Sequence, residues 1–463
     1  MLGSSVLVAA SPEYYGRSIS AERESESELF LNERGELDGE LYDKRGKMFQ
    51  NPKINLAGRG ETKMLEKRQQ PGFNYGSSKV RGVNIGGWLV AEPWITPSLF
   101  DDTGDSRVID EWTFGEYVSD AASRLEHHWA TFYTESDFAQ IAAAGLNHVR
   151  IPIGYWALDK GSSPFIQGNQ YNYLKQAVGW ARNHGLKVLV DLHGVPGSQN
   201  GFDNSGRKIS PPRWFNQESY KNRAKAVIQT FANDFASQTD VVTSIELVNE
   251  PLTTSGPSNA LSFTRDYYNN AYYAARYTSK GQLTNFAVTM HDGFQPLTYW
   301  QGAYQPPQYQ QVILDTHQYS VFNQDQLQMS NNARLGYFCN LGGQVETSNK
   351  NLYTVVGEWT TAPTDCAKYL NGRGIGARYD GTYPGSSKIG SCNGKTGKGT
   401  NFSSSYKSFL KQMFDTQRKA YERGTGWIMW TWKTEEAADW DYQRGLQYGW
   451  ITKNLNSFSS SYC

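Results

Sequence analysis

Two glutamates stand where apolar, strand-like segments of the sequence end. Residues 245–248 carry three apolar side chains, and an amide, Glu250 and Pro251 follow at once. Proline cannot continue the hydrogen-bond ladder of a strand, so we expect Glu250 at the strand's carboxyl end. Glu358 closes a similar segment, residues 353–357. Two carboxyl groups that meet at such ends could hydrolyse a glycoside, because one protonates the leaving oxygen while the other attacks the sugar.

The elements that must position these glutamates recur from residue 79 onward. Apolar segments with polar ends alternate with helical periodicities, such as those over 171–181 and 220–235. Strands that are apolar nearly throughout and alternate with helices are typical of a parallel sheet covered by helices. No GxGxxG turn follows the first strand, which disfavours an open doubly wound sheet. We predict an α/β fold, a single (β/α)8 TIM barrel with long βα-loop insertions. Its predicted strands are Val80–Gly87, His148–Gly154, Lys187–Gly194, Val242–Glu250, Asn285–Asp292, Val312–Tyr319, Tyr353–Trp359 and Gly426–Lys433.

The ends of these strands should converge on one mouth of the barrel. Each polar residue there has an ordinary structural explanation when it is considered alone. Together they predict a polar pocket with a stacking surface, which is what a sugar ring requires. The residues are Asn84, Glu92, Arg150, Asp191, His193, Asn249, Glu250, His291, Asp292, His317, Tyr319, Glu358, Trp430 and Trp432.

Composition restricts the classes of partner. The 463 residues contain 45 Lys plus Arg and 45 Asp plus Glu, so no overall field favours nucleic acid or an anionic membrane. No apolar run approaches the roughly 18 residues of a membrane span. The sequence shows no cluster of metal ligands. We therefore expect no nucleic-acid partner, no membrane span, no metal and no cofactor.

Four cysteines lie in the last third of the chain, and none forms a CxxC pair. This spacing argues against a zinc ribbon or a thioredoxin-type site. An even number suits two disulfides in an oxidising compartment, and three pairings are possible. The four are Cys339, Cys366, Cys392 and Cys463.

The first 75 residues differ in composition from the rest. Residues 17–70 are rich in Glu, Lys, Arg and Gly and poor in aromatics, which predicts disorder. Lys67 and Arg68 form either a solvated pair or the place where a pro-segment is cut. Residues 1–10 make a weak signal peptide, because no basic residue precedes their short apolar run. We predict residues 1–75 as a disordered extension or processed pro-segment, and 76–463 as the (β/α)8 catalytic domain.

Eight motifs together resemble glycoside hydrolase family 5, and within it the fungal exo-β-1,3-glucanase group. The Asn-Glu-Pro motif alone is weak, but all eight in this order are specific. The resemblance covers residues 79–463 and leaves out the N-terminal extension. The motifs are Gly82–Trp88, Val149–Trp156, Asp191–Gly194, Gly201–Gly206, Asn249–Pro251, His317–Tyr319, Gly357–Trp359 and Trp430–Lys433.

The resemblance implies a role for each matching residue. Glu250 would be the general acid/base and Glu358 the nucleophile. Arg150 would hold Glu358 ionised by lowering its pKa, while partial burial and the neighbouring charge would raise the pKa of Glu250. Phe202 and Phe322 would clamp a sugar at the entrance. The implied substrate-binding residues are Glu92, Arg150, His193, Phe202, Asp203, Asn204, Asn249, His317, Tyr319, Phe322 and Trp430.

The implied activity is retaining, exo-acting release of glucose from the non-reducing ends of β-1,3-glucan through a covalent glucosyl-enzyme, with transglycosylation and β-1,6 cleavage as further activities. The partner would be β-1,3-glucan or a laminari-oligosaccharide. Two alternatives stay open: an endo-β-1,4-glucanase or mannanase on the same barrel, and a non-catalytic glucan-binding cell-wall protein. Exo action would need a closed groove end. The long segments that could form it are Glu92–Trp129, Ala157–Tyr171, Val195–Pro212 and Thr360–Lys407.

The resemblance also implies properties of the whole protein. The disulfides would pair Cys339 with Cys463 and Cys366 with Cys392. A secreted or cell-wall location and a monomeric state are expected. The only N-glycosylation sequon, at Asn401, fits a surface loop of a secreted protein.

Overall fold

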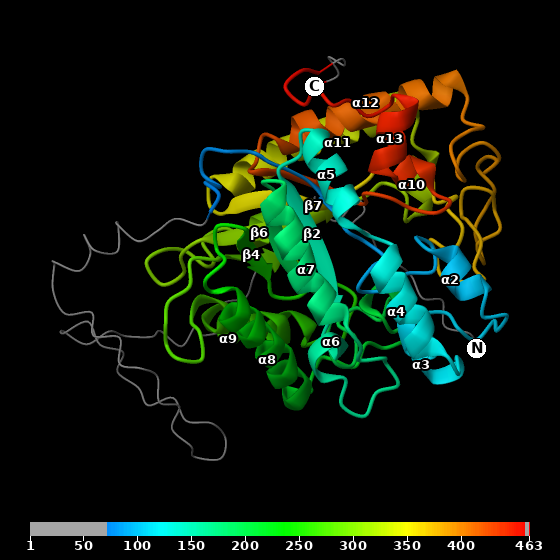
Figure 1. Ribbon diagram of the computed structural model, residues 1–463. Helices are drawn as coiled ribbons and strands as arrows, with labels where there is room; N and C mark the ends of the chain where they lie inside the picture. The colour runs from blue at the N-terminus through cyan, green and yellow to red at the C-terminus, as the bar shows by residue number, and fades with distance from the viewer. Residues whose placement is uncertain (1–71, 459–462) are drawn as a thin grey trace.

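A closed barrel of eight parallel strands forms the centre of the protein (Figure 1). The computed structural model describes residues 72–458 and Cys463. The strands pair in chain order and β1 pairs with β8, so the predicted (β/α)8 TIM barrel is confirmed. The strands are β1 (Val80–Asn84), β2 (His148–Gly154), β3 (Lys187–Gly194), β4 (Val242–Glu246), β5 (Ala287–His291), β6 (Val312–Gln318), β7 (Tyr353–Trp359) and β8 (Gly426–Met429).

Strand β4 ends earlier than its apolar pattern predicts. It stops at Glu246, four residues before Glu250. The amide of Leu247 still donates to Thr289 O at 3.0 Å on β5, but the amide of Asn249 donates to Leu192 O at 3.0 Å on β3. The chain therefore leaves the regular ladder while it stays bonded to both neighbouring strands. Glu250 follows in a turn with φ +45, so it lies beyond the strand end rather than on it.

Helices surround the barrel, and α7, α8 and α9 cover the side seen in Figure 1. The apolar periodicities predict α7 and α8 correctly, since their buried residues repeat at helical spacing. Gly185, with φ +71, follows the last residues of α7 as a glycine after a helix should. The helices are α2 (Pro97–Asp101), α3 (Glu111–Tyr117), α4 (Ala121–Thr131), α5 (Glu135–Ala143), α6 (Trp156–Asp159), α7 (Gln170–Asn183), α8 (Glu218–Phe235), α9 (Ala260–Arg276), α10 (Gln324–Gln328), α11 (Asn331–Asn349), α12 (Ser404–Tyr421) and α13 (Tyr442–Tyr448).

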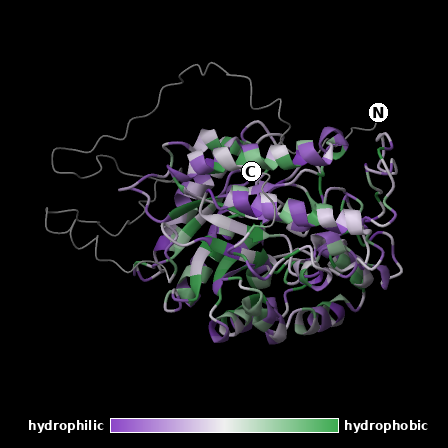
Figure 2. Cartoon of the chain, turned by 90° about the horizontal axis from the view of Figure 1, so that it is seen from above, coloured by the Kyte–Doolittle hydropathy of each residue, from purple (hydrophilic) through white to green (hydrophobic). Residues whose placement is uncertain are grey.

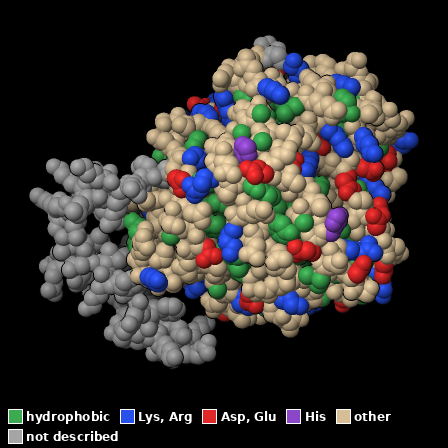
Figure 3. Space-filling view, viewed as in Figure 1, with side chains coloured by type: hydrophobic (Ala, Val, Ile, Leu, Met, Phe, Trp, Pro, Cys, Tyr) green, Lys and Arg blue, Asp and Glu red, His purple; other side chains and the backbone are tan. Residues whose placement is uncertain are grey.

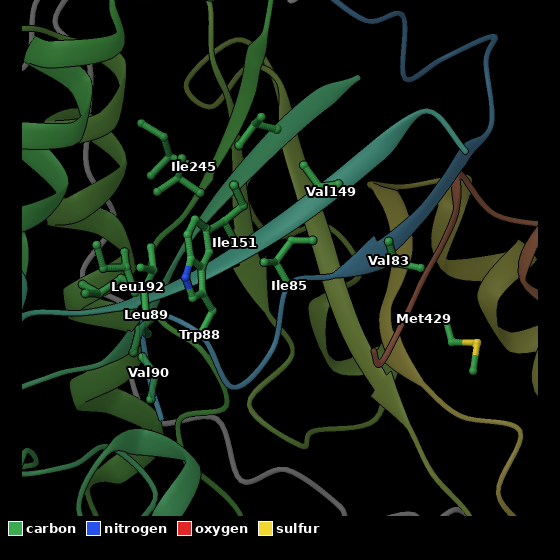
Figure 4. Close-up of a cluster of buried hydrophobic side chains, with 14 of the residues drawn as sticks. Val83, Ile85, Trp88, Leu89, Val90, Val149, Ile151, Leu192, Ile245 and Met429 are labelled. Carbon is green, nitrogen blue, oxygen red and sulfur yellow. The ribbon is translucent and has the colours of Figure 1, made fainter. Parts of the chain in front are cut away.

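The hydrophobic core lies between the strands and the helices that cover them. Figure 4 shows side chains from β1, β2, β3 and β4 in one cluster, among them the fully buried Val83, Val149 and Ile245. The outer helices carry hydrophilic as well as hydrophobic residues, as Figure 2 shows. Burying one stripe of each helix against the barrel leaves the other to water, which is the arrangement that stabilises parallel barrels.

The chain joins the barrel at its first described residues. Phe73 packs edge-on against His148 with ring centroids 4.4 Å apart, and the hydroxyl of Tyr75 donates to Thr243 Oγ1 at 2.7 Å. The predicted N-terminal extension falls mostly on residues 1–71, which lie outside the described residues. Of residues 1–75, the structure describes 72–75, and Phe73 and Tyr75 among them contact the barrel.

Two disulfides join the pairs that the resemblance implies. One links Cys339 on α11 to Cys463, and the other links Cys366 to Cys392 within the segment between β7 and α12. Residues 72–458 contain no helix that is long and apolar enough to cross a membrane. On the face shown in Figure 3, basic and acidic side chains are interspersed, in agreement with the balanced composition.

Candidate active site

A buried arginine organises the carboxyl ends of the strands. Arg150 on β2 has no exposed surface, and its guanidinium contacts residues from or just beyond five other strands. Burying a cation costs free energy unless it is paired and hydrogen-bonded. Here each of the guanidinium nitrogens lies close to at least one carboxylate or amide oxygen. Its partners are Asn84 (3.0 Å), Asp191 (3.1 Å), Glu246 (2.7 Å), Asn249 (2.8 Å) and Glu358 (2.9 Å), with Asp315 at 4.0 Å.

Arg150 and the acids around it shift one another's pKa values. Burial lowers the pKa of Arg150, but the charges of Asp191, Glu246, Glu358 and Asp315 outweigh it and raise that pKa well above the ordinary value. Burial raises the pKa of Glu246 well above its ordinary value, against the attraction of Arg150. The guanidinium is therefore permanently charged and faces Glu358 at ion-pair distance.

Glu250 and Glu358 meet at one imidazole ring. Nδ1 of His317, on β6, lies 2.7 Å from Glu250 Oε1 and 3.4 Å from Glu358 Oε2. The two distances leave at most about 6 Å between these oxygens, which is compatible with the roughly 5–5.5 Å of a retaining pair. Tyr319 donates its hydroxyl proton to Glu358 Oε2 at 2.9 Å, and Asn204 donates an amide proton to Glu250 Oε2 at 3.0 Å.

The protonation of the two glutamates differs from the prediction. Burial raises the pKa of Glu250, but the hydrogen bond and charge of His317 outweigh it, and the pKa lies below the ordinary value. Burial is the largest influence on Glu358 and holds its pKa above the ordinary value despite Arg150 and His317. The expected order of the two pKa values was wrong because His317 was not considered as a cation. Burial lowers the pKa of His317, but Glu358, Asp315 and Glu250 raise it well above the ordinary value.

A stacked histidine and tryptophan form another side of the site. The ring of His193 lies parallel to that of Trp430, with centroids 5.5 Å apart and an interplanar angle of 14°. His193 Nδ1 is 2.6 Å from Asp191 Oδ2, while its Nε2 has no protein partner. Glu92 Oε1 is likewise buried and unpaired, although Oε2 accepts from Trp94 Nε1 at 3.0 Å. Unpaired buried groups around one cavity are the positions where the hydroxyls of a sugar can bind.

The segment after β3 adds polar groups next to Glu250. Asp203 and Asn204 lie in a short 3₁₀ turn, and Asp203 Oδ2 is buried without a partner. Burial raises the pKa of Asp203 to about 6. Phe202 is partly buried just before the turn. Phe322 contacts Tyr319 edge-on at 5.3 Å, and in the described chain no ring contact joins it to Phe202, so the clamp stays a prediction.

Two segments far apart in sequence are joined through Asp101. Asp101, at the end of α2, accepts from Lys368 Nζ at 2.6 Å, from the hydroxyl of Tyr369 at 2.8 Å and from Arg373 Nη2 at 3.2 Å. Arg373 also donates to two backbone carbonyls of the segment after α2. In Figure 1 the segment between β7 and α12 lies beside α2. These contacts form a continuous wall from the insertions after β1 and β7.

Four residues near the site were missed by the sequence reasoning. Glu246 and Asp315 hold Arg150, and Trp94 and Trp440 pack together at 5.0 Å beside Tyr319. A charged residue inside an otherwise apolar strand was the available signal for Glu246 and Asp315, because it must find a partner in the interior. The two tryptophans gave no such signal, because tryptophan in this chain is usually a core residue.

Two clusters of described residues have the composition of a metal site: Glu250 with His291 and His317, and Glu246 with Asp315 and His317. Both share His317, whose nitrogens already face Glu250 at 2.7 Å and Asp315 at 3.5 Å. The hydrogen bonds explain these clusters, and we assign no metal to them. Asn401 is exposed in the turn before α12, where a glycan could be attached.

A parallel barrel whose mouth holds two glutamates at one histidine, a buried arginine and a set of unpaired polar groups defines a glycosidase. The chain belongs to glycoside hydrolase family 5: the family model described as "Cellulase (glycosyl hydrolase family 5)" matches residues 115–374. It is 48% identical over 375 residues to "Probable glucan 1,3-beta-glucosidase A" of Aspergillus niger, which covers 80% of this chain and 86% of that protein. It is 46% identical over 401 residues to "Glucan 1,3-beta-glucosidase" of Blumeria graminis, covering 85% and 91%.

Solved structures agree on the fold. The rutinosidase from Aspergillus niger superposes with a TM-score of 0.64 at 21% identity, over 82% of this chain and 99% of that chain. A family 5 xyloglucanase from Paenibacillus pabuli gives a TM-score of 0.51 at 15% identity, over 82% and 97%. At these identities the likeness shows the barrel alone.

Proposed function

We propose that this protein is a retaining exo-β-1,3-glucanase that removes glucose from the non-reducing end of β-1,3-glucan. The observation that carries the proposal is the meeting of Glu250 and Glu358 at His317, with Arg150 and Tyr319 on the second carboxyl group. The names of the fungal relatives support the substrate class.

In the first step Glu358 attacks the anomeric carbon and Glu250 protonates the leaving oxygen. Arg150 and Tyr319 hold the attacking carboxylate in place through bonds of 2.9 Å each. Asn249 Nδ2 is buried and unpaired, so it is free to donate to the 2-hydroxyl of the sugar as positive charge develops. In the second step Glu250 accepts a proton from water, which hydrolyses the glucosyl-enzyme.

Before a sugar binds, the proton for the leaving oxygen is shared in the hydrogen bond between His317 and Glu250. Because Glu358 loses its charge as it is glycosylated, the cationic state of His317 loses one of the three carboxylates that support it, Glu358, Asp315 and Glu250. A sugar that displaces water from the site also weakens the ionised form of Glu250. Both changes favour transfer of the proton along the 2.7 Å hydrogen bond to Glu250 when substrate is bound.

The wall that Asp101 joins supports exo action in this proposal. A groove closed on one side by the segments after β1 and β7 admits a chain terminus and stops an internal glucose unit. Glu92, His193, Asp203 and Trp430 then bind the terminal ring, and Phe202 and Phe322 contact the following unit at the entrance.

The proposal extends to the whole protein. The catalytic domain comprises residues 76–463 together with Phe73 and Tyr75, which pack against its barrel, and the protein acts as a monomer in the cell wall or outside the cell. The two disulfides support an oxidising location. The exposed position of Asn401 supports glycosylation there.

Digestion of laminarin, followed by NMR of the released anomer, tests the proposal. We expect glucose as the only early product and the β-anomer before mutarotation, because two displacements retain configuration. Early mixed oligomers would show endo action, and an α-anomer would exclude the retaining mechanism. No hydrolysis with intact binding would favour the non-catalytic alternative.

Azide rescue tests the roles of the two glutamates separately. With an aryl β-glucoside whose leaving group needs no acid, Glu358→Ala with azide should form the α-glucosyl azide, since azide takes the place of the nucleophile. Glu250→Ala should form the β-glucosyl azide from the glucosyl-enzyme. Exchanged stereochemistry between the two variants would reverse the assignment.

A further inference from the structure

A second polar pocket lies behind the wall of the active site, between α11 and α12, which pack side by side. It encloses about 170 Å³, several times the roughly 30 Å³ of a water molecule in the liquid. Arg334, Lys395, Thr364, Tyr379 and Tyr406 contribute side chains to its lining, and no Asp or Glu of the described chain does so.

Two cations face this pocket without an acidic partner. Arg334 is 2% exposed, and its guanidinium donates to neutral oxygens only, the carbonyl and hydroxyl of Ser320 and the carbonyl of Gln326. Lys395 lies over the ring of Tyr406, with its amine 4.0 Å from the centroid. No carboxylate of the described residues lies within ion-pair distance of either cation. Burial lowers the pKa of Arg334 to about 10, which leaves it charged at neutral pH.

Two helix N-termini point to the same space. Asn331 is the first residue of α11, and Ser405 and Tyr406 lie in the first turn of α12. These helices have 19 and 18 residues, and their first backbone N–H groups carry partial positive charge toward the pocket. The hydroxyl of Thr364, 3% exposed, faces Tyr406 and makes no hydrogen bond of regular geometry.

The one acid near the pocket does not neutralise it. Asp439 lies behind Tyr406, whose hydroxyl is 3.3 Å from Asp439 Oδ2. Burial raises the pKa of Asp439 to about 8, and the charge of Lys395 acts against this rise. Arg334 therefore brings a buried positive charge to a pocket in which no described carboxylate lies within ion-pair distance of it.

We propose that this pocket binds a small tetrahedral oxyanion, such as phosphate or sulfate, either free or carried on a sugar. An oxyanion offers enough acceptor oxygens for Arg334, Lys395, the Thr364 hydroxyl and the first amides of α12 at once, which monovalent chloride does not. Because Arg334 also holds Ser320, the residue after Tyr319, a bound oxyanion stabilises the segment that carries the hydrogen-bond donor to Glu358.

Thermal unfolding in sodium phosphate, sodium sulfate and sodium chloride at matched ionic strength tests this proposal. Phosphate and sulfate should raise the Tm saturably by about 2–4 °C relative to chloride. Lys395→Gln should weaken the response, whereas Lys411→Gln, on the same helix as Ser405 but outside the pocket, should respond like the wild type. Ser405→Glu places a carboxylate in the first turn of α12 and should abolish the response without lowering the Tm in anion-free buffer.

Equal shifts with phosphate and chloride, or a full response in Ser405→Glu, would overturn the site. Isothermal titration of inorganic phosphate into the wild type and Lys395→Gln gives a second readout that does not depend on unfolding, and identical affinities would also overturn it. Glucose 6-phosphate distinguishes a free oxyanion from one carried on a sugar. A Tm shift equal to that with inorganic phosphate indicates a sugar-borne group, and a shift with inorganic phosphate only indicates a free anion.

Discussion

Removing one hydroxyl group isolates what Tyr319 contributes to the nucleophile. In Tyr319→Phe the ring keeps its contacts with Phe322 at 5.3 Å and Trp440 at 5.6 Å, so only the 2.9 Å hydrogen bond to Glu358 is lost. A hydrogen bond to a charged group contributes about 1.5–3 kcal/mol. If the whole of it acts in the transition state, kcat/KM should fall about 10- to 150-fold.

The same variant has a pH signature. A donor favours the ionised carboxyl group, so its loss raises the pKa of Glu358. Because Glu358 must be ionised to attack, the acid limb of the kcat/KM profile should move to higher pH. The assay is the initial rate on an aryl β-glucoside across pH, with the exposed Tyr273→Phe as the matched control. A kcat/KM within twofold of the wild type and an unmoved acid limb would refute the reasoning.

Two further predictions concern stability. The fold raises the pKa of Asp203 from 3.8 to about 6 and so favours its protonated form. The stability that this form contributes is fully present below pH 3.8 and is lost as the pH rises through 6. Asp203→Asn should therefore gain Tm over the wild type between pH 4 and 6, by an amount equivalent to at most about 3 kcal/mol, and a constant difference across that range would contradict this. Removing the Cys366–Cys392 bridge with Cys366→Ala and Cys392→Ala should cost about 3.5 kcal/mol of unfolding free energy, because the bridge closes a loop with a sequence separation of 26. A loss below about 1 kcal/mol in chemical denaturation would mean that the contacts of Asp101 hold the segment without the bridge.

The barrel and the two glutamates could be predicted from the sequence because their signals are local. Apolar runs with polar ends predict strands within a few residues, and three strands, β2, β3 and β7, coincide with their predicted ranges. The early end of β4 could not be predicted, since Leu247 and Val248 are as apolar as the strand before them. Their hydrogen bonds to two different neighbours exist only once the barrel closes.

The protonation of the site and its wall depend on contacts that no local pattern records. His317 reads in the sequence as one more polar strand end, yet its distances to Glu250, Glu358 and Asp315 reverse the predicted order of the two glutamate pKa values. Lys368 binds Asp101 across 267 positions of the sequence. Electrostatics of this kind depend on distances in space, whereas a sequence orders residues only along the chain.

The way in which Arg150 is surrounded has a consequence for assembly. The first four strands carry Arg150 and two of its acidic partners, Asp191 and Glu246. The other two, Asp315 and Glu358, come from the second half of the barrel. An isolated second half would lack Arg150 and would hold these two acids with His317 alone beside them. Duplicating or exchanging half-barrels can therefore rebuild the architecture of this protein but not its reactive centre, which exists only when both halves come from complementary sequences.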